Sequence, residues 1–276
     1  MNELEKIINK IDDSYKEVIK VAFEAGDIQR ENFRRADLEI DTKSTSVDMV
    51  TEVDRKCDAH IVARLKALFP HDEILSEEQG LFPPELPRQT SDADEESYQW
   101  IIDPLDGTTN YSIGHPVFAV SIARWDSKGP VFGVVYVPML NELFYAQRDA
   151  GAYMNHKLIK ASSQTELGKA VLGTGFPYDR ATANNNNGEN IKTLIPLIKG
   201  VRRMGAAAYD LCLVAAGIYD AFWELRLCKW DMAAGMLMIL EAGGVFDVFE
   251  EDGKYNVITG NSELVRAISK RVDIHN

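Results

Sequence analysis

Apolar residues recur every three or four positions along the beginning of the chain. Between residues 3 and 34 they are Leu4, Ile7, Ile8, Ile11, Tyr15, Val18, Ile19, Ala22 and Phe23. This spacing places them on one face and predicts a long amphipathic helix. A second helix is predicted from residue 51, where Thr-Glu-Val-Asp has the composition of a capping box, to about Leu68. Pro70 interrupts a helix and therefore ends it.

Short apolar runs bounded by turn residues predict strands. These runs lie at residues 73–75, 100–102, 117–125, 131–137, 143–147, 245–249 and 256–259. Further helices are predicted before Pro196 and at residues 206–216, 230–242 and 263–271. Strands and helices alternate in blocks and not in strict strand–helix–strand units. This order predicts a layered α and β fold with mixed or antiparallel sheets.

Two polar segments predict surface loops. Residues 82–97 hold three prolines and an acidic tract, which predicts a solvated loop and not a metal site. Residues 184–188 read Asn-Asn-Asn-Asn-Gly, and we assign no chemistry to them. At 276 residues, the chain is long enough for one large domain or two closely joined lobes.

The charge balance narrows the range of partners. The chain has 30 Lys and Arg residues against 43 Asp and Glu residues, a net charge of −13. This balance argues against nucleic acid or an anionic membrane as the main partner. It leaves a small anionic substrate open, because bound cations can invert the local field.

The cellular setting is inferred from what the sequence lacks. Residues 1–20 are charged throughout, and no later run approaches the roughly 20 apolar residues of a membrane span. The three cysteines are scattered and form no Cys-x-x-Cys pair, so neither a disulfide framework nor a thiolate metal site is expected. We therefore expect a cytoplasmic protein with no membrane partner.

The strongest chemical pattern is Trp-Ile-Ile-Asp-Pro-Leu-Asp-Gly-Thr-Thr-Asn at residues 100–110. An apolar strand ends in Asp103 and Asp106, which direct two carboxylates at one spot. Mg²⁺ prefers such oxygen ligands. Gly107 and Thr108 follow, and their N–H and hydroxyl groups suit a phosphate oxygen. The combination predicts metal-assisted phosphate ester chemistry.

Three other acidic residues stand out by their context. Glu77 follows the strand at 73–75, Asp231 begins a helix, and Asp54 belongs to the capping box. Each also has a purely structural interpretation, as a surface charge or a helix cap. That interpretation suits the Asp103/Asp106 pair less well, because a plain turn after a buried strand needs no two carboxylates.

The segment from Asp103 to Asn110 closely resembles the signature of the inositol monophosphatase family. Four further motifs of that family match Lys43-Ser44, residues 48–54, residues 76–78, and Trp230-Asp231 with the Ala-Ala-Gly and Glu-Ala-Gly-Gly that follow. Order and spacing agree from about residue 15 to 268. The resemblance implies an α/β fold, an αβαβα five-layer sandwich. It also implies one catalytic domain over 1–276, with metal-binding loops in a lobe of about 1–150 and Glu224 and Asp231 in a lobe of about 151–276.

The resemblance also implies a site for two or three Mg²⁺ ions. Glu77, Asp103 and the Leu105 carbonyl would bind one ion. Asp103, Asp106 and Asp231 would bind a second. A third, weaker ion would involve Glu77 and water molecules, which places Glu77 among the catalytic residues as well.

The remaining roles follow from the same resemblance. Asp54 and Thr108 would orient and deprotonate the attacking water. The substrate would contact Asp106, Gly107, Thr108, Gly205, Ala206, Ala207, Glu224 and Asp231. His115 more plausibly packs or caps than accepts a phosphoryl group, so we expect direct attack by water.

The motifs do not decide which phosphate ester is the substrate. Thr109-Asn110 after Asp-Gly-Thr resembles the inositol branch, whereas the nucleotide branch tends to carry Lys-Glu there. A carboxylate at Glu224 suits the vicinal hydroxyls of a polyol. We therefore expect an inositol 1-phosphate phosphatase, with fructose 1,6-bisphosphate and 3′-phosphoadenosine 5′-phosphate as alternative substrates. Arg202-Arg203 either reach a second phosphate or pair with surface acids, and the acidic insert at 88–97 is a candidate lid.

Three further expectations derive from the family. The resemblance implies a homodimer that acts on a small phosphate ester, and it implies inhibition by lithium at the second metal position. A different class of function is a catalytically dispensable protein associated with RNA and transcription, because some bacterial relatives have that association. The net charge of −13 weighs against direct RNA binding.

Overall fold

The computed structural model describes residues 11–43, 49–86, 97–155 and 157–274. Its helices are α2 (Asp13–Asn32), α3 (Glu52–Leu68), α4 (Thr108–Ser112), α5 (Gly188–Leu194), α6 (Ala207–Ala215), α7 (Lys229–Glu241) and α8 (Ser262–Ser269), with 3₁₀ turns η1 (Leu167–Lys169) and η2 (Ile195–Leu197). Within these ranges, no helix is both long and apolar enough to cross a lipid bilayer.

The larger sheet has eight strands in the order β10-β9-β8-β7-β6-β5-β3-β4. In chain order they are β3 (Glu73–Ser76), β4 (Gly80–Phe82), β5 (Gln99–Asp106), β6 (Ala119–Asp126), β7 (Gly129–Val137), β8 (Glu142–Gln147), β9 (Gly151–Met154) and β10 (Lys157–Leu158). All neighbours are antiparallel except β3 and β5, which run parallel. That parallel pair brings the ends of β3 and β5 to the same edge of the sheet.

The second sheet has five strands in the order β12-β11-β13-β15-β14. They are β11 (Val171–Thr174), β12 (Gly200–Arg202), β13 (Ala221–Leu227), β14 (Val245–Glu251) and β15 (Lys254–Gly260). Strand β11 runs parallel to β12 and β13, and the other pairs are antiparallel. A separate ribbon joins β1 (Ile40–Thr42) to β2 (Met49–Thr51).

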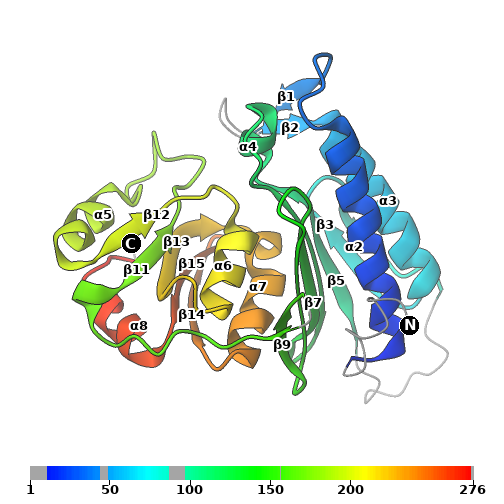
Figure 1. Ribbon diagram of the computed structural model, residues 1–276. Coiled ribbons are helices and arrows are strands. Elements are labelled where there is room, and N and C mark those ends of the chain that lie inside the picture. The colour runs from blue at the N-terminus through cyan, green and yellow to red at the C-terminus, as the bar shows by residue number, and fades with distance from the viewer. Residues whose placement is uncertain (1–10, 44–48, 87–96, 156, 275–276) are drawn as a thin grey trace.

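The elements stack in five layers, which Figure 1 shows nearly edge-on. Helices α2 and α3 cover one face of the large sheet, and α6 and α7 lie between the two sheets. Helices α5 and α8 lie on the far side of the small sheet. Three clusters of buried apolar side chains fill the spaces between these layers. Burying such surface contributes about 25 cal/mol per Å², so these interfaces hold the layers together. The predicted αβαβα architecture is confirmed.

Most of the predicted elements are present. The predicted amphipathic face of the first helix is buried in α2, while residues 1–10 lie outside the described residues. Helix α3 begins with the predicted capping box at Thr51, and α7 is followed by Gly243 in the left-handed region (φ 83°). The strands β11, β12 and β13 were not predicted. They matter because β13 carries Glu224.

Candidate functional site

The two aspartates of the 100–110 segment lie where β5 breaks its register with β6. The pairing is regular up to Asp103, shifts, and resumes at Asp106. Both side chains are buried, and Asp103 Oδ1 accepts a hydrogen bond from the Leu105 N–H (3.0 Å). This shift in register, a β-bulge, therefore fixes both carboxyl groups at the end of the strand.

Gly107 turns the chain out of β5 with a φ of 92°, in the left-handed region. A Cβ atom there would lie 3.1 Å from the Val117 carbonyl oxygen and 3.2 Å from that of Gly205. Glycine is thus needed both for the backbone conformation and for the close approach of the 205–207 segment. The turn brings these two distant parts of the sequence together.

Asp106 joins the large sheet to α6. Its Oδ1 accepts the Ala207 N–H (3.0 Å), and its Oδ2 accepts the Ala208 N–H (2.9 Å). These are donors that the first turn of a helix leaves without intrahelical partners. The carboxyl group that was predicted to bind metal therefore also positions the segment that was predicted to contact the substrate.

Glu77 directly follows β3 and lies beside β5, because its N–H donates to the Ile102 carbonyl oxygen (3.1 Å). Its carboxylate is 2.8 Å from the Lys43 Nζ, which also contacts Glu78. Burial alone would lower the pKa of Lys43, but the two glutamates raise it above its usual value. Ser44 and Asp48, from the motif around Lys43, lie outside the described residues.

Asp54 and Thr108 are in direct contact. The Thr108 hydroxyl lies 2.9 Å from Asp54 Oδ1 and 3.0 Å from the Leu105 carbonyl oxygen. The other oxygen of Asp54 accepts the Thr51 N–H (2.8 Å) within the capping box. Burial raises the pKa of Asp54 to about 6, although the hydrogen bonds from Thr51 and Thr108 oppose that rise.

Asp231 reaches the same region from α7, in the helical layer between the two sheets. It is the third residue of α7, and its Oδ2 accepts the Cys228 N–H (2.7 Å) at the helix start. We call the space that it faces the carboxylate pocket. This cavity of about 330 Å³ is lined by Glu77, Asp103, Leu105, Asp106, Thr108 and Asp231, among others.

The acidic groups of the carboxylate pocket repel one another. Burial, and then the negative charges of their neighbours, raise the pKa values of Asp103 and Asp231 well above the usual range. Burial also raises the pKa of Asp106. Like-charged buried groups favour a bound cation, which would offset the repulsion.

The donor set fits a hard divalent cation, since it consists of carboxylates and one backbone carbonyl. In the described parts of the chain, no group of three or more His, Cys, Asp or Glu side chains already has the arrangement of a metal site. At least one oxygen of each of these aspartates accepts a hydrogen bond from a backbone N–H. Carboxylate oxygens have two lone pairs each, so these hydrogen bonds leave capacity for an ion.

A smaller space, which we call the side pocket, opens between the two sheets. It is lined by Asp106, Gly205, Ala206, Ala207, Asp210 and Glu224, among others. Burial raises the pKa of Glu224 to about 8, and Arg203 opposes that rise. A Cβ atom at Gly175 would lie 2.0 Å from Glu224 Oε1, so this glycine provides the room for the carboxyl group.

Asp210 also lines the side pocket, and it was not predicted as a site residue. It lies on α6 with only 1% of its surface exposed, and its Oδ1 has no hydrogen-bond partner within the described structure. Burial, and then the charge of Glu224, raise its pKa well above the usual range. The available signal was a single carboxylate in the apolar stretch at 206–216, since such groups are rarely buried without a reason.

The other residues that the sequence singled out lie outside the two pockets or line only one of them. Arg203 lines the side pocket, whereas the Arg202 guanidinium donates to its neighbour's carbonyl at Val201 (3.0 Å). His115 is exposed, and its N–H caps the Asn110 carbonyl (2.8 Å), as its predicted capping role requires. The acidic part of the candidate lid lies outside the described residues.

The chain is similar to known proteins over most of its length. The model of the family described as "Inositol monophosphatase family" matches residues 11–273. A Mesorhizobium japonicum protein named "Inositol-1-monophosphatase" is 36% identical over 92% of this chain and 94% of its own length. A Pseudomonas aeruginosa protein named "Nus factor SuhB" is 38% identical over 93% of this chain and 94% of its own length. The solved structure of a Thermotoga maritima IMPase covers 94% of this chain and 96% of its own, with 31% identity and a TM-score of 0.80.

Proposed function

Because the chain belongs to the inositol monophosphatase family, we propose that it is a Mg²⁺-dependent phosphate monoesterase. Its proposed substrate is inositol 1-phosphate or a similar polyol or sugar phosphate. One observation carries this proposal. Glu77, Asp103, Asp106 and Asp231, from distant parts of the sequence, line one pocket beside the Asp54–Thr108 pair.

The proposal assigns the acidic groups to metal binding. Glu77, Asp103 and the Leu105 carbonyl would hold one Mg²⁺, and Asp103, Asp106 and Asp231 a second. A third ion at Glu77 would be held largely by water. When bound, such ions stabilise negative charge on the attacking and leaving oxygens of a phosphoryl transfer.

The proposed base is Asp54, acting through Thr108. The 2.9 Å hydrogen bond fixes the hydroxyl of Thr108, which also faces the carboxylate pocket. A base is most effective when its pKa lies near the working pH, and the Asp54 pKa of about 6 meets that condition. Asp54 would accept the proton of the attacking water while Thr108 holds that water in line with the phosphate.

The two ends of the substrate would be held by different groups. The N–H groups of Gly107 and Thr108 would donate to phosphate oxygens at the turn after β5. Glu224 and residues 205–207 would contact the alcohol part in the side pocket, and we add Asp210 to this set. Two carboxyl groups there suit the vicinal hydroxyls of a polyol, which donate as well as accept hydrogen bonds.

The substitution Asp103→Asn tests the metal assignment. Asparagine retains the oxygen that accepts the Leu105 N–H, so the variant is expected to fold, but it removes the charge that a cation needs. Phosphate release from inositol 1-phosphate should fall at least about a hundredfold, as metal-site losses of this kind do. EDTA should abolish the wild-type rate and excess Mg²⁺ should restore it. Near-normal turnover by a folded D103N protein would reject the assignment.

Lithium provides a second test of the same ions. Li⁺ would compete for the position formed by Asp103, Asp106 and Asp231, so the rate should fall as lithium rises. Full activity at high lithium would argue against that position. A cytoplasmic location remains a prediction from the sequence, and a homodimer remains a prediction from the family.

A second candidate belongs to another class of function, because the Pseudomonas aeruginosa relative carries the name of a Nus factor. On this alternative, the chain would act by binding the transcription machinery, and its catalysis would be dispensable. The net charge of −13 disfavours direct contact with RNA. Stable capture of RNA polymerase by a protein without phosphatase activity would favour this alternative over the enzyme.

A further inference from the structure

Arg226 has an unusual backbone conformation beside the carboxylate pocket. Its φ is 60°, in the left-handed region that residues other than glycine rarely occupy. It lies where β13 breaks its register with β15, between Glu224 and Leu227. Its N–H donates to Asn256 Oδ1 (2.8 Å), which fixes this bulge. Such strain persists only where the surroundings hold it, and it is often found at functional sites.

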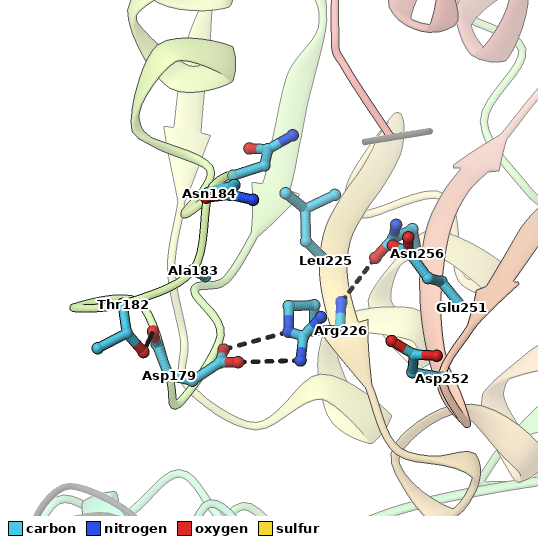
Figure 2. A pocket seen from close by; sticks show the side chains of 10 residues that line it. Asp179, Thr182, Ala183, Asn184, Leu225, Arg226, Glu251, Asp252 and Asn256 are labelled. Atoms are coloured by element: carbon cyan, nitrogen blue, oxygen red, sulfur yellow. Dashed lines mark hydrogen bonds and ion pairs between the residues drawn. The ribbon is translucent and has the colours of Figure 1, made fainter.

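The side chain of Arg226 extends toward Asp179, and Figure 2 shows the two groups pointing at each other from β13 and from the neighbouring loop. Arg226 Nε lies 3.2 Å from Asp179 Oδ1, and a terminal nitrogen lies 2.9 Å from Oδ2. Arg226 lines the carboxylate pocket, the side pocket and an outer pocket of about 300 Å³, the one drawn in Figure 2. Arg226 is therefore shared by all three pockets.

Lys254 places a second positive charge at the same rim. It lines the carboxylate pocket, and its Nζ donates to Cys228 Sγ (2.8 Å). Among the described residues, no carboxylate oxygen lies within 4.0 Å of its ammonium group. Burial acts to lower the pKa of Lys254, but Cys228 and Asp231 raise it overall, so the ammonium group keeps its charge. Arg226 and Lys254 thus both line the carboxylate pocket, near enough for their positive charges to interact, and no carboxylate of the described residues bridges them.

We propose that Arg226 and Lys254 form an anion subsite, which binds a second phosphate or carboxylate on the alcohol part of the substrate. This inference rests on the proposed phosphatase function and adds to its substrates a class of esters that carry a second negative group. Asp179 would hold the guanidinium in the free protein and compete with that group. A pocket of about 330 Å³ lies within the range that holds small ligands.

Matched pairs of esters test the subsite in the full-length protein with Mg²⁺. Fructose 1,6-bisphosphate and fructose 1-phosphate differ by a second phosphate, whereas 2-phosphoglycerate and glycerol 2-phosphate differ by a carboxylate. The measured quantity is the ratio of kcat/KM within each pair. Each ratio compares the ester that carries the second negative group with the ester that lacks it. Removing a charge-assisted hydrogen bond from the subsite should lower this ratio about 10- to 100-fold for the pair whose second group the subsite binds. Whichever pair shows the effect identifies the second group.

The variants Arg226→Gly and Lys254→Gln remove the two charges. Glycine suits the left-handed position, so the first variant is expected to fold. Arg202→Gln is the matched control, because that guanidinium contacts Val201 and lines none of the pockets described above. Asp179→Asn should act in the opposite direction, raising the ratio by freeing the guanidinium from its competitor.

The alternative explanation is that the Arg226–Asp179 pair only fastens a loop. In that case R226G and D179N would lower the thermal unfolding midpoint alike and leave both ratios at the wild-type value. That outcome, with inositol 1-phosphate still hydrolysed, overturns the subsite but keeps the phosphatase. If no ester is hydrolysed, the proposed function fails. Calorimetry then tests the subsite by measuring the binding of the same esters. If the two esters of each pair bind equally well, both to the wild-type protein and to R226G, the subsite is rejected.

Discussion

At the scale of single residues, Thr108 connects the proposed base to the proposed metal site. Its hydroxyl lies 2.9 Å from Asp54 and 3.0 Å from the Leu105 carbonyl oxygen, so it can donate to only one of them at a time. Its backbone belongs to the turn that would hold the phosphate. One side chain thus lies next to the proposed base, a proposed metal ligand and the proposed position of the substrate.

The variant Thr108→Val should lower kcat about 10²-fold or more, with a smaller effect on KM, because it removes the hydroxyl that orients the water and keeps the shape. Initial rates with inositol 1-phosphate measure this. Thr165→Val, at an exposed residue, is the control and should retain the wild-type rate. A T108V enzyme with wild-type kcat would exclude Thr108 from the reaction.

The pH dependence of the residual rate gives an independent check. A base must be deprotonated, so activity should rise with pH through the pKa of Asp54 of about 6. The hydrogen bond from Thr108 acts to lower that pKa, so its removal in T108V should move the acidic limb of the profile to higher pH. A limb that stays in place would indicate that another group controls it.

At the scale of elements, the turn between β5 and α4 determines how closely the two halves of the chain approach. Gly107 lies close to the backbone of Val117 and Gly205, and Asp106 accepts the first N–H groups of α6. The strand end, the short helix α4 and the start of α6 therefore form one connected unit. A change in the turn is transmitted to the side pocket.

Gly107→Ala should destabilise the protein by about 1–3 kcal/mol, because a Cβ there meets both an unfavourable φ and crowded backbone atoms. Gly253→Ala is the matched control, since Gly253 has a φ of 72° but nothing within 4 Å of the added atom. Urea unfolding of both variants measures the difference. Equal losses of stability would show that crowding at the turn has no energetic consequence.

The elements that could be predicted from sequence are those with local signals. Helix α3 has a capping box, α7 ends before Gly243, and β5 is an apolar run that stops at Asp103. Strand β13 has no such signal. Charged residues interrupt its apolar pattern, and its partners β11 and β15 lie far along the chain. Tertiary pairing, and not propensity, makes it a strand.

The residues of the candidate site likewise divide into those with a local sequence signal and those without one. Asp103 and Asp106 were predicted because they lie close together in the sequence, Asp231 because it begins a helix, and Glu224 because the family resemblance covers it. The ion pair of Arg226 with Asp179 joins residues 47 positions apart, so no local pattern could reveal it. Asp210 had a usable signal, a carboxylate on an apolar helix, and was still missed.

At the scale of the whole molecule, the site gathers buried negative charge between two sheets. Burial raises the pKa values of Asp54, Asp103, Asp106, Asp231 and Glu224. The folded chain therefore binds more protons than the unfolded chain between the ordinary carboxyl pKa and these raised values. Folding stability must decrease with pH across that window.

The metal-free protein should accordingly lose on the order of 5 kcal/mol of unfolding free energy between pH 5 and pH 8, since one pKa unit corresponds to about 1.4 kcal/mol and Asp54 and Glu224 together span about four such units in this range. This pH window follows from the pKa of Asp54, about 6, and the pKa of Glu224, about 8. Saturating Mg²⁺ should reduce this loss by binding the ionised carboxylates of the folded state. Urea unfolding at several pH values, with EDTA or Mg²⁺, measures both effects. A stability that rises with pH in EDTA would contradict the burial of these charges.

The most direct test of the account is a crystal of the protein grown with Mn²⁺ and phosphate, examined by anomalous scattering at the manganese edge. The account predicts at least two peaks in the carboxylate pocket, bound by Glu77, Asp103, Asp106 and Asp231, with phosphate against the turn at Gly107. An empty pocket, or metal peaks only elsewhere on the molecule, would contradict it.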